Sequence, residues 1–123
     1  MTTENAATGA IICLFIAAIA WIMVGVVRWA AERGDVNAAT SIRLPSLMRS
    51  PRAWAAGHRA AVPAFGWTAV LTSTASVLAA AAALLRAETL FLALLVVACV
   101  DLTLGGVLGI LVAHRAAGRA TDR

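Results

Sequence analysis

The chain has 123 residues, of which 62% are hydrophobic and only 13% are charged, and its mean hydropathy is +0.89. A soluble domain is about 45–50% apolar and about 25% charged, and a domain of this size buries only about 60–70% of its surface. The composition therefore excludes an ordinary soluble domain. It predicts a single all-α membrane domain over residues 1–123, with lipid as the solvent for most side chains.

The basic residues are all Arg, ten against six acidic residues, and they give a formal net charge of +4. Most charges lie beside the ends of long apolar runs, which is typical of membrane topology signals and not of a nucleic-acid-binding surface. We therefore expect no nucleic-acid partner. Cys13 and Cys99 each lie inside an apolar run, so we interpret them as small apolar side chains without a disulfide framework.

The first apolar run extends over about residues 6–27 and ends at Arg28 and Trp29, a charge and an aromatic residue typical of the membrane interface. About 20 apolar residues cross a hydrocarbon core about 30 Å thick. The run follows Glu4 and not a basic segment, and it is longer than the core of a cleavable signal peptide. We therefore expect a permanent transmembrane helix.

A polar, Arg-rich segment of about residues 28–61 follows, and it contains a helix-start signal at Ser50 and Pro51. Ser supplies an N-cap oxygen, and Pro fits the first helical position. At about 100° per residue, one face of residues 51–62 is apolar and the other is basic. The two faces contain Trp54, His58, Ala61 and Val62 against Arg52 and Arg59. The pattern predicts a short amphipathic helix at headgroup level, followed by a kink at Pro63.

Two further apolar runs, over about residues 62–85 and 89–113, are long enough to cross a bilayer. Helix is the expected state for each, because backbone polar groups in lipid must be satisfied within the segment. Only residues 86–88 separate the two runs. This spacing predicts a tight antiparallel hairpin.

The arginines are distributed unequally between the two sides that this topology creates. One side carries Arg28, Arg33, Arg43, Arg49, Arg52, Arg59, Arg115, Arg119 and Arg123. The other side carries Arg86 with Glu4 and Glu88. By the positive-inside rule, we expect the N-terminus outside the cell membrane of a bacterium, and the basic loop and the C-terminus in the cytoplasm.

Asp101 is the acidic residue near the middle of the third run, where an ionised carboxylate costs a few kcal/mol unless it is sheltered. Gly105 and Gly109 follow at intervals of four residues, so the three share one stripe, and the glycines allow another helix to approach closely. Three interpretations remain open for Asp101: a neutral, hydrogen-bonded residue that fixes helix register, a partner contact, or a proton or ion relay.

The second run offers hydroxyl donors for this carboxyl at Thr72, Ser73 and Ser76. A turn centred near residue 87 places side by side the residues at equal distance from it. Counting from this turn pairs Asp101 with Ser73.

Residues suited to metal binding or catalysis are sparse. His58 and His114 both lie near the same membrane surface in this topology, but no carboxylate or Cys accompanies them. Two His alone are a weak set for a metal or haem. Paired carboxylates, a metalloprotease motif, a phosphate-binding Gly loop and a Ser–His or Cys–His arrangement are absent from the sequence. We expect no enzyme activity, no metal and no cofactor.

Residues 41–59 resemble the signature of the SdpI family, which is named for immunity to a secreted sporulation-delaying toxin. Members show a Gly-Ile/Tyr-Arg-Thr-Pro stretch, then a Trp, then a small-residue/His (or Asn)-Arg group that opens a transmembrane helix. The matching positions are Ile42, Arg43, Pro45, Trp54, His58 and Arg59, with Asn37 at the place of an upstream Asn. Ser41 replaces the usual Gly and Leu44 the usual Thr, and the resemblance covers about residues 37–74.

The resemblance implies a small membrane protein that acts by binding, in toxin immunity or envelope signalling, with a peptide toxin or a membrane protein as its partner. The residues alone also support a simpler interpretation, in which the arginines bind anionic lipid headgroups and Trp54 anchors the interface. A non-catalytic accessory subunit of a larger membrane complex is the alternative from a different class. A small transporter component is a third.

Overall fold

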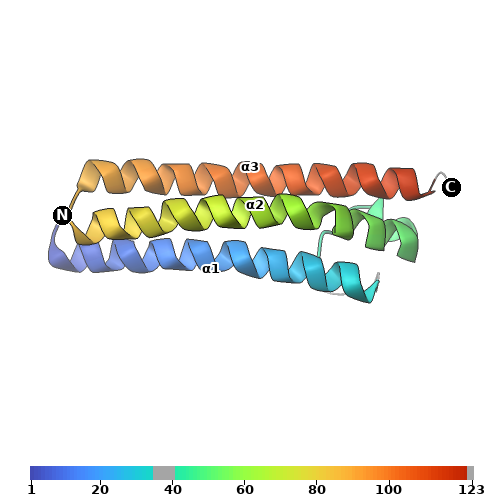
Figure 1. The fold of residues 1–123 in the computed structure, drawn as a ribbon, viewed down its shortest axis with the longest axis horizontal. Helices are drawn as coiled ribbons and strands as arrows, with labels where there is room; N and C mark the ends of the chain where they lie inside the picture. The colour runs from blue at the N-terminus through green and yellow to red at the C-terminus, as the bar shows by residue number, and fades with distance from the viewer. Residues whose placement is uncertain (35–40, 122–123) are drawn as a thin grey trace.

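The computed structural model describes residues 1–34 and 41–121. Within these ranges the chain forms three α-helices and one short 3-10 helix, and no strand. The elements are α1 (Thr3–Arg33), η1 (Leu47–Arg49), α2 (Pro51–Leu84) and α3 (Glu88–Thr121). Figure 1 shows the long helices side by side, with α2 between α1 and α3. The prediction of an all-α fold with three long apolar helices is confirmed.

Each long helix is apolar enough to cross a bilayer. The mean hydropathy of its most apolar 18-residue stretch is 2.9 in α1, 1.5 in α2 and 2.4 in α3. Half of the residues in this stretch of α2 are buried inside the protein, whereas only 6% are buried in the stretch of α3. The least apolar helix is therefore the one that other helices cover. This arrangement indicates a multi-pass membrane protein in which α2 is the common packing partner and α3 offers most of its surface to its surroundings.

The helix ends have clear local causes. The Ser50 hydroxyl accepts a hydrogen bond from the backbone N–H of Ala53 at 3.1 Å, and Pro51 occupies the first helical position, as the sequence predicts. At the end of α1, Gly34 adopts the left-handed conformation (φ 61°) and its N–H bonds to the carbonyl of Ala30. Glycine suits this position because it has no Cβ to clash.

The predicted hairpin between α2 and α3 is present. Arg86 has φ 58°, and the N–H of Ala87 reaches back to the carbonyl of Ala82 at 2.9 Å, which closes the last turn of α2. The Arg86 guanidinium donates to the Thr3 hydroxyl at 2.7 Å, and the N-terminal amine lies 3.5 Å from the Glu88 carboxylate. At this end, which we call the hairpin end, Arg86, Glu88 and the N-terminal amine therefore have partners close by.

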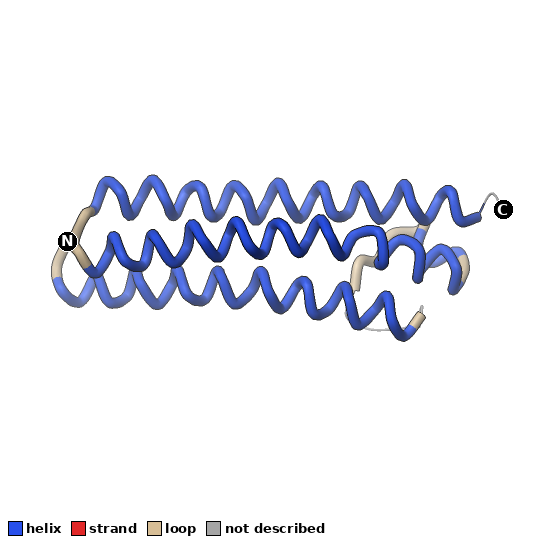
Figure 2. The backbone as a smooth tube through the Cα atoms, viewed as in Figure 1, coloured by secondary structure: helices blue, strands red, loops and turns tan. Residues whose placement is uncertain are grey.

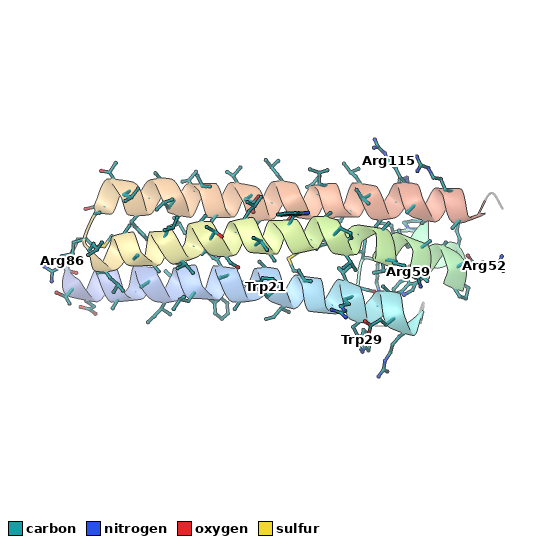
Figure 3. All side chains as sticks on the ribbon, viewed as in Figure 1. Trp21, Trp29, Arg52, Arg59, Arg86 and Arg115 are labelled. Atoms are coloured by element: carbon teal, nitrogen blue, oxygen red, sulfur yellow. The ribbon has the colours of Figure 1, made fainter. Side chains whose placement is uncertain are left out.

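The opposite end, formed by the end of α1, the start of α2 and the end of α3, carries the other arginines of the described chain. Figure 3 shows Arg52, Arg59 and Arg115 there, together with Trp29, and Arg86 at the far end of the bundle. We call this the Arg-rich end. The unequal distribution of Arg that the sequence predicts is thus present in the fold.

A separate amphipathic helix over residues 51–62 is not formed. These residues are the first turns of α2, which continues through Pro63 without a break (Figure 2). Their apolar face packs on α1, η1 and α3 in a core that includes Val27, Leu47 and Ala113. Because this face has protein partners, the helix stays aligned with the bundle, and the loss of one backbone hydrogen bond at a proline does not end it.

A second core lies toward the hairpin end and consists mainly of small side chains of α1 and α2 with Phe91 of α3. Small residues let helix backbones approach closely, which is the usual source of packing energy in lipid. Cys13 is buried here, Cys99 is exposed on α3, and both thiols are free.

Candidate functional site

Two aromatic residues of the motif that resembles the SdpI signature lie at the Arg-rich end, where α2 meets the last turn of α1. Trp54 and His58 are completely buried, with ring centroids 4.3 Å apart. The Trp54 Nε1–H donates to the carbonyl of Ala30 at 3.1 Å. The His58 ring meets the Trp54 carbonyl through Nδ1 at 2.9 Å. A carbonyl can only accept, so Nδ1 carries the hydrogen, and Nε2 is a buried acceptor that has no partner among the described residues.

The loop before α2 is attached to α3 at the same level. The Ser46 hydroxyl and His114 Nδ1 are 2.8 Å apart, and Leu47 is completely buried between the helices. A Cβ added to Gly57 would lie 3.0 Å from the carbonyl oxygen of Ala113 and from the Leu47 side chain. A side chain at position 57 would therefore crowd the contact of α2, η1 and α3.

The structure separates the motif into buried and exposed members. Ile42 packs against the core that contains Trp54, and His58 is buried. Arg43, Pro45 and Arg59 are exposed. Asn37 lies outside the described residues. Trp54 was expected to turn its ring toward the headgroup layer, but the ring is buried in protein and its N–H donates to the Ala30 carbonyl.

The two His do not form a joint site: His58 bonds to the Trp54 carbonyl, and His114 pairs with Ser46. Within the described residues, no group of three or more His, Cys, Asp or Glu is placed to hold a metal ion. Sequence reasoning missed Ser46 and Gly57. Gly57 could have been noticed in the sequence, because it lies three residues after Trp54 in a predicted helix, where a glycine often marks a close contact.

Next to this cluster, an apolar groove of about 450 Å³ runs between α1 and α3, above Phe65 of α2. Val26 and Ile110 line its two sides, and the loop segment 41–44 closes it toward the Arg-rich end. Among the lining residues, only Ser41 and Arg43 are polar, and both belong to this loop. The groove exists because α1 and α3 both pack on α2 and have little contact with each other.

The intramembrane carboxyl faces α2. The Thr72 hydroxyl donates to Asp101 Oδ2 at 2.6 Å, while the hydroxyl oxygens of Ser73 and Ser76 are buried without a partner in the described chain. The predicted partner, Ser73, is therefore wrong by one residue. A shift of one position turns a side chain by about 100° around the helix, so the residue that meets α3 changes.

The glycine stripe lies on the same contact, one and two turns beyond Asp101. A Cβ at Gly105 would overlap the Thr68 side chain, and a Cβ at Gly109 would lie 2.5 Å from the Phe65 ring. Successive turns of α3 thus meet successive turns of α2, through a hydrogen bond at Asp101 and through the Thr68 and Phe65 side chains that lie against the α3 backbone at Gly105 and Gly109. The arrangement fixes the register of the two helices.

Comparison with models of known protein families, with curated proteins and with solved structures finds no match. The geometry and the motif residues are therefore the basis for a functional proposal.

Proposed function

We propose that this chain is a non-enzymatic, SdpI-like protein of the bacterial cell membrane that acts by binding, in toxin immunity or envelope signalling. The observation that carries the proposal is the division of the motif at the Arg-rich end. Trp54 and His58 are buried where α1, α2 and α3 meet, and Arg43 and Arg59 are exposed beside them. A buried aromatic pair with exposed guanidinium groups at the same end of the bundle suits recognition of an acidic or anionic partner.

The orientation in this proposal follows from charge. The Arg-rich end faces the cytoplasm, with the C-terminus, and the hairpin end and the N-terminus face outward. The exposed arginine of the motif on α2, Arg59, binds anionic headgroups of the inner leaflet in addition to any protein partner.

A protection assay tests the proposal directly. The chain is expressed in bacteria sensitive to a panel of membrane-active peptides, and survival is scored at matched protein levels in the membrane. We expect protection against at least one peptide, loss of protection with Arg59→Gln, and unchanged protection with Arg52→Gln. Both arginines are exposed on α2, but only Arg59 belongs to the motif. If no peptide in the panel distinguishes expressing from control cells, the immunity function is excluded for that panel, and envelope signalling is the remaining form of the proposal.

The exposed surface of α3 favours a second candidate, a non-catalytic accessory subunit of a larger membrane complex. Only 6% of the most apolar stretch of α3 is buried, and a Cβ at Gly106 would meet nothing within 4 Å. This face can therefore accept a neighbouring helix. A stoichiometric partner that co-purifies in mild detergent, and that is lost with Gly106→Leu, would support this candidate over the immunity function.

A further inference from the structure

The groove between α1 and α3 has the position that the first carbons of a lipid tail occupy in a bilayer. Val26 lies two residues before Arg28, Phe65 follows the start of the second apolar run, and Ile110 precedes His114 by four residues. At a rise of 1.5 Å per residue, the three side chains lie within about 10 Å of the polar boundary. The closed end of the groove is therefore at headgroup depth and the rest is at acyl-chain depth.

The polar atoms of the groove are concentrated at that closed end. The exposed Arg43 supplies a positive charge there. The Ser41 hydroxyl oxygen is buried and has no hydrogen-bond partner among the described residues. A guanidinium and a free hydroxyl next to an apolar channel complement a phosphate or glycerol oxygen that continues into a hydrocarbon chain.

The volume favours a thin occupant. One turn of an α-helix, about 10 Å wide and 5.4 Å long, already has a volume close to that of the groove, about 450 Å³. A spanning partner helix would therefore lie almost entirely outside it, whereas an extended acyl chain matches its volume. Cavities of this size are typical of small-ligand sites.

We propose that this groove is a binding site for one acyl chain of an anionic glycerophospholipid, with the lipid phosphate at Arg43 and Ser41. The inference goes beyond the proposed function and is independent of it. Transfer of the chain from bulk lipid to the groove changes its apolar surroundings little. Selectivity therefore comes from the charge at Arg43, and the site prefers an anionic lipid over a zwitterionic one with the same tails.

Native mass spectrometry of the full-length protein in mild detergent tests the site. Dioleoyl phosphatidylglycerol and dioleoyl phosphatidylcholine are added separately, and the first bound lipid per chain is quantified. We expect the phosphatidylglycerol adduct to form at lower lipid concentration. Arg43→Gln should reduce this preference about fivefold, which corresponds to about 1 kcal/mol for one Arg near an anionic headgroup. Arg52→Gln, an exposed arginine at the same end that does not line the groove, should leave the preference unchanged.

A second pair of variants tests the apolar part. Ile110→Trp fills the groove and should remove the first adduct of both lipids, whereas Leu108→Trp should keep it. Leu108 is exposed two residues away, on the opposite side of α3. Circular dichroism and gel filtration confirm that each variant is folded. Equal binding of the two lipids, an equal effect of Arg52→Gln, an unchanged first adduct in Ile110→Trp, or a bound peptide in place of lipid would each overturn the proposal.

Discussion

The Thr72 hydroxyl donates a hydrogen bond to Asp101 Oδ2 across 2.6 Å, and this bond links α2 to α3 deep within their apolar segments. Thr72 is completely buried. A carboxyl at this depth needs shelter, because lipid offers no hydrogen-bond donor. The contact shelters the carboxyl and ties α2 to α3 at this level of the hairpin.

Removal of the donor should therefore destabilise the bundle. Thr72→Val should lower the free energy of unfolding by about 1 kcal/mol, and Asp101→Asn by about 0.6 kcal/mol or less, since the amide oxygen still accepts from Thr72. The measurement is unfolding in mixed detergent micelles, followed by circular dichroism. Thr74→Val is the matched control, because the Thr74 hydroxyl bonds to the Val70 carbonyl of its own helix. Equal losses for Thr72→Val and Thr74→Val would contradict the linking function.

The glycines of α3 give a comparison between adjacent residues. Gly105→Ala should force α2 and α3 apart, because the new Cβ would overlap Thr68, whereas a Cβ at Gly106 meets nothing within 4 Å. We expect Gly105→Ala to cost about 1–3 kcal/mol, as overpacking does. Gly106→Ala should be neutral or slightly stabilising, because Ala has the higher helix propensity. The same micelle unfolding assay measures both, and a Gly105→Ala protein as stable as Gly106→Ala would exclude the close approach.

Trp54 should behave as a core residue and not as an interface anchor. Trp54→Ala should cost about 3–5 kcal/mol, and Trp54→Phe about 1 kcal/mol through the hydrogen bond lost to Ala30. Trp67, which is 70% exposed, provides the control, and Trp67→Ala should change the unfolding free energy by less than either. If the alanine variant of Trp54 does not fold, the phenylalanine variant still gives the comparison. A Trp54→Phe protein that loses no stability relative to Trp67→Ala would place the ring outside the core.

Orientation can be measured by cysteine accessibility in a background with Cys13→Ala and Cys99→Ala. Met48→Cys in η1 and Thr89→Cys at the start of α3 are the reporters, since both positions are exposed and lie at opposite ends of the bundle. We expect an impermeant maleimide to label Thr89→Cys in intact cells, and to label Met48→Cys only after permeabilisation. The reverse pattern would invert the proposed topology. Ser46 is a poor reporter, because it is buried and pairs with His114.

The long helices were predictable because the contrast between apolar and polar segments extends over some twenty residues. Their full lengths were not. The apolar runs were expected over about 6–27, 62–85 and 89–113, whereas the helices span Thr3–Arg33, Pro51–Leu84 and Glu88–Thr121. Hydropathy marks the part suited to lipid, but a helix can continue beyond it until a capping residue ends it, as Gly34 ends α1.

The environment of Trp54 was not predictable from periodicity. An amphipathic pattern indicates which side of a helix is apolar. It does not indicate whether lipid or a protein core covers that side. The choice depends on α1 and α3, which are remote in sequence.

The Asp101 partner was missed for a different reason. Symmetric counting around a turn carries an error of one residue, and on a helix this error decides between Thr72 and Ser73. The groove has no local signal at all, because its walls come from three helices and a loop.

The length of α2 has a structural consequence. Its 34 residues extend about 50 Å, whereas a hydrocarbon core is about 30 Å thick. About 20 Å of continuous helix therefore extends beyond the lipid tails, and its first turns are packed against α1 and α3. The same helix contains both Thr72 and Trp54. The hydrogen bond inside the bilayer and the buried ring at the Arg-rich end therefore belong to one continuous helix, with no loop between them.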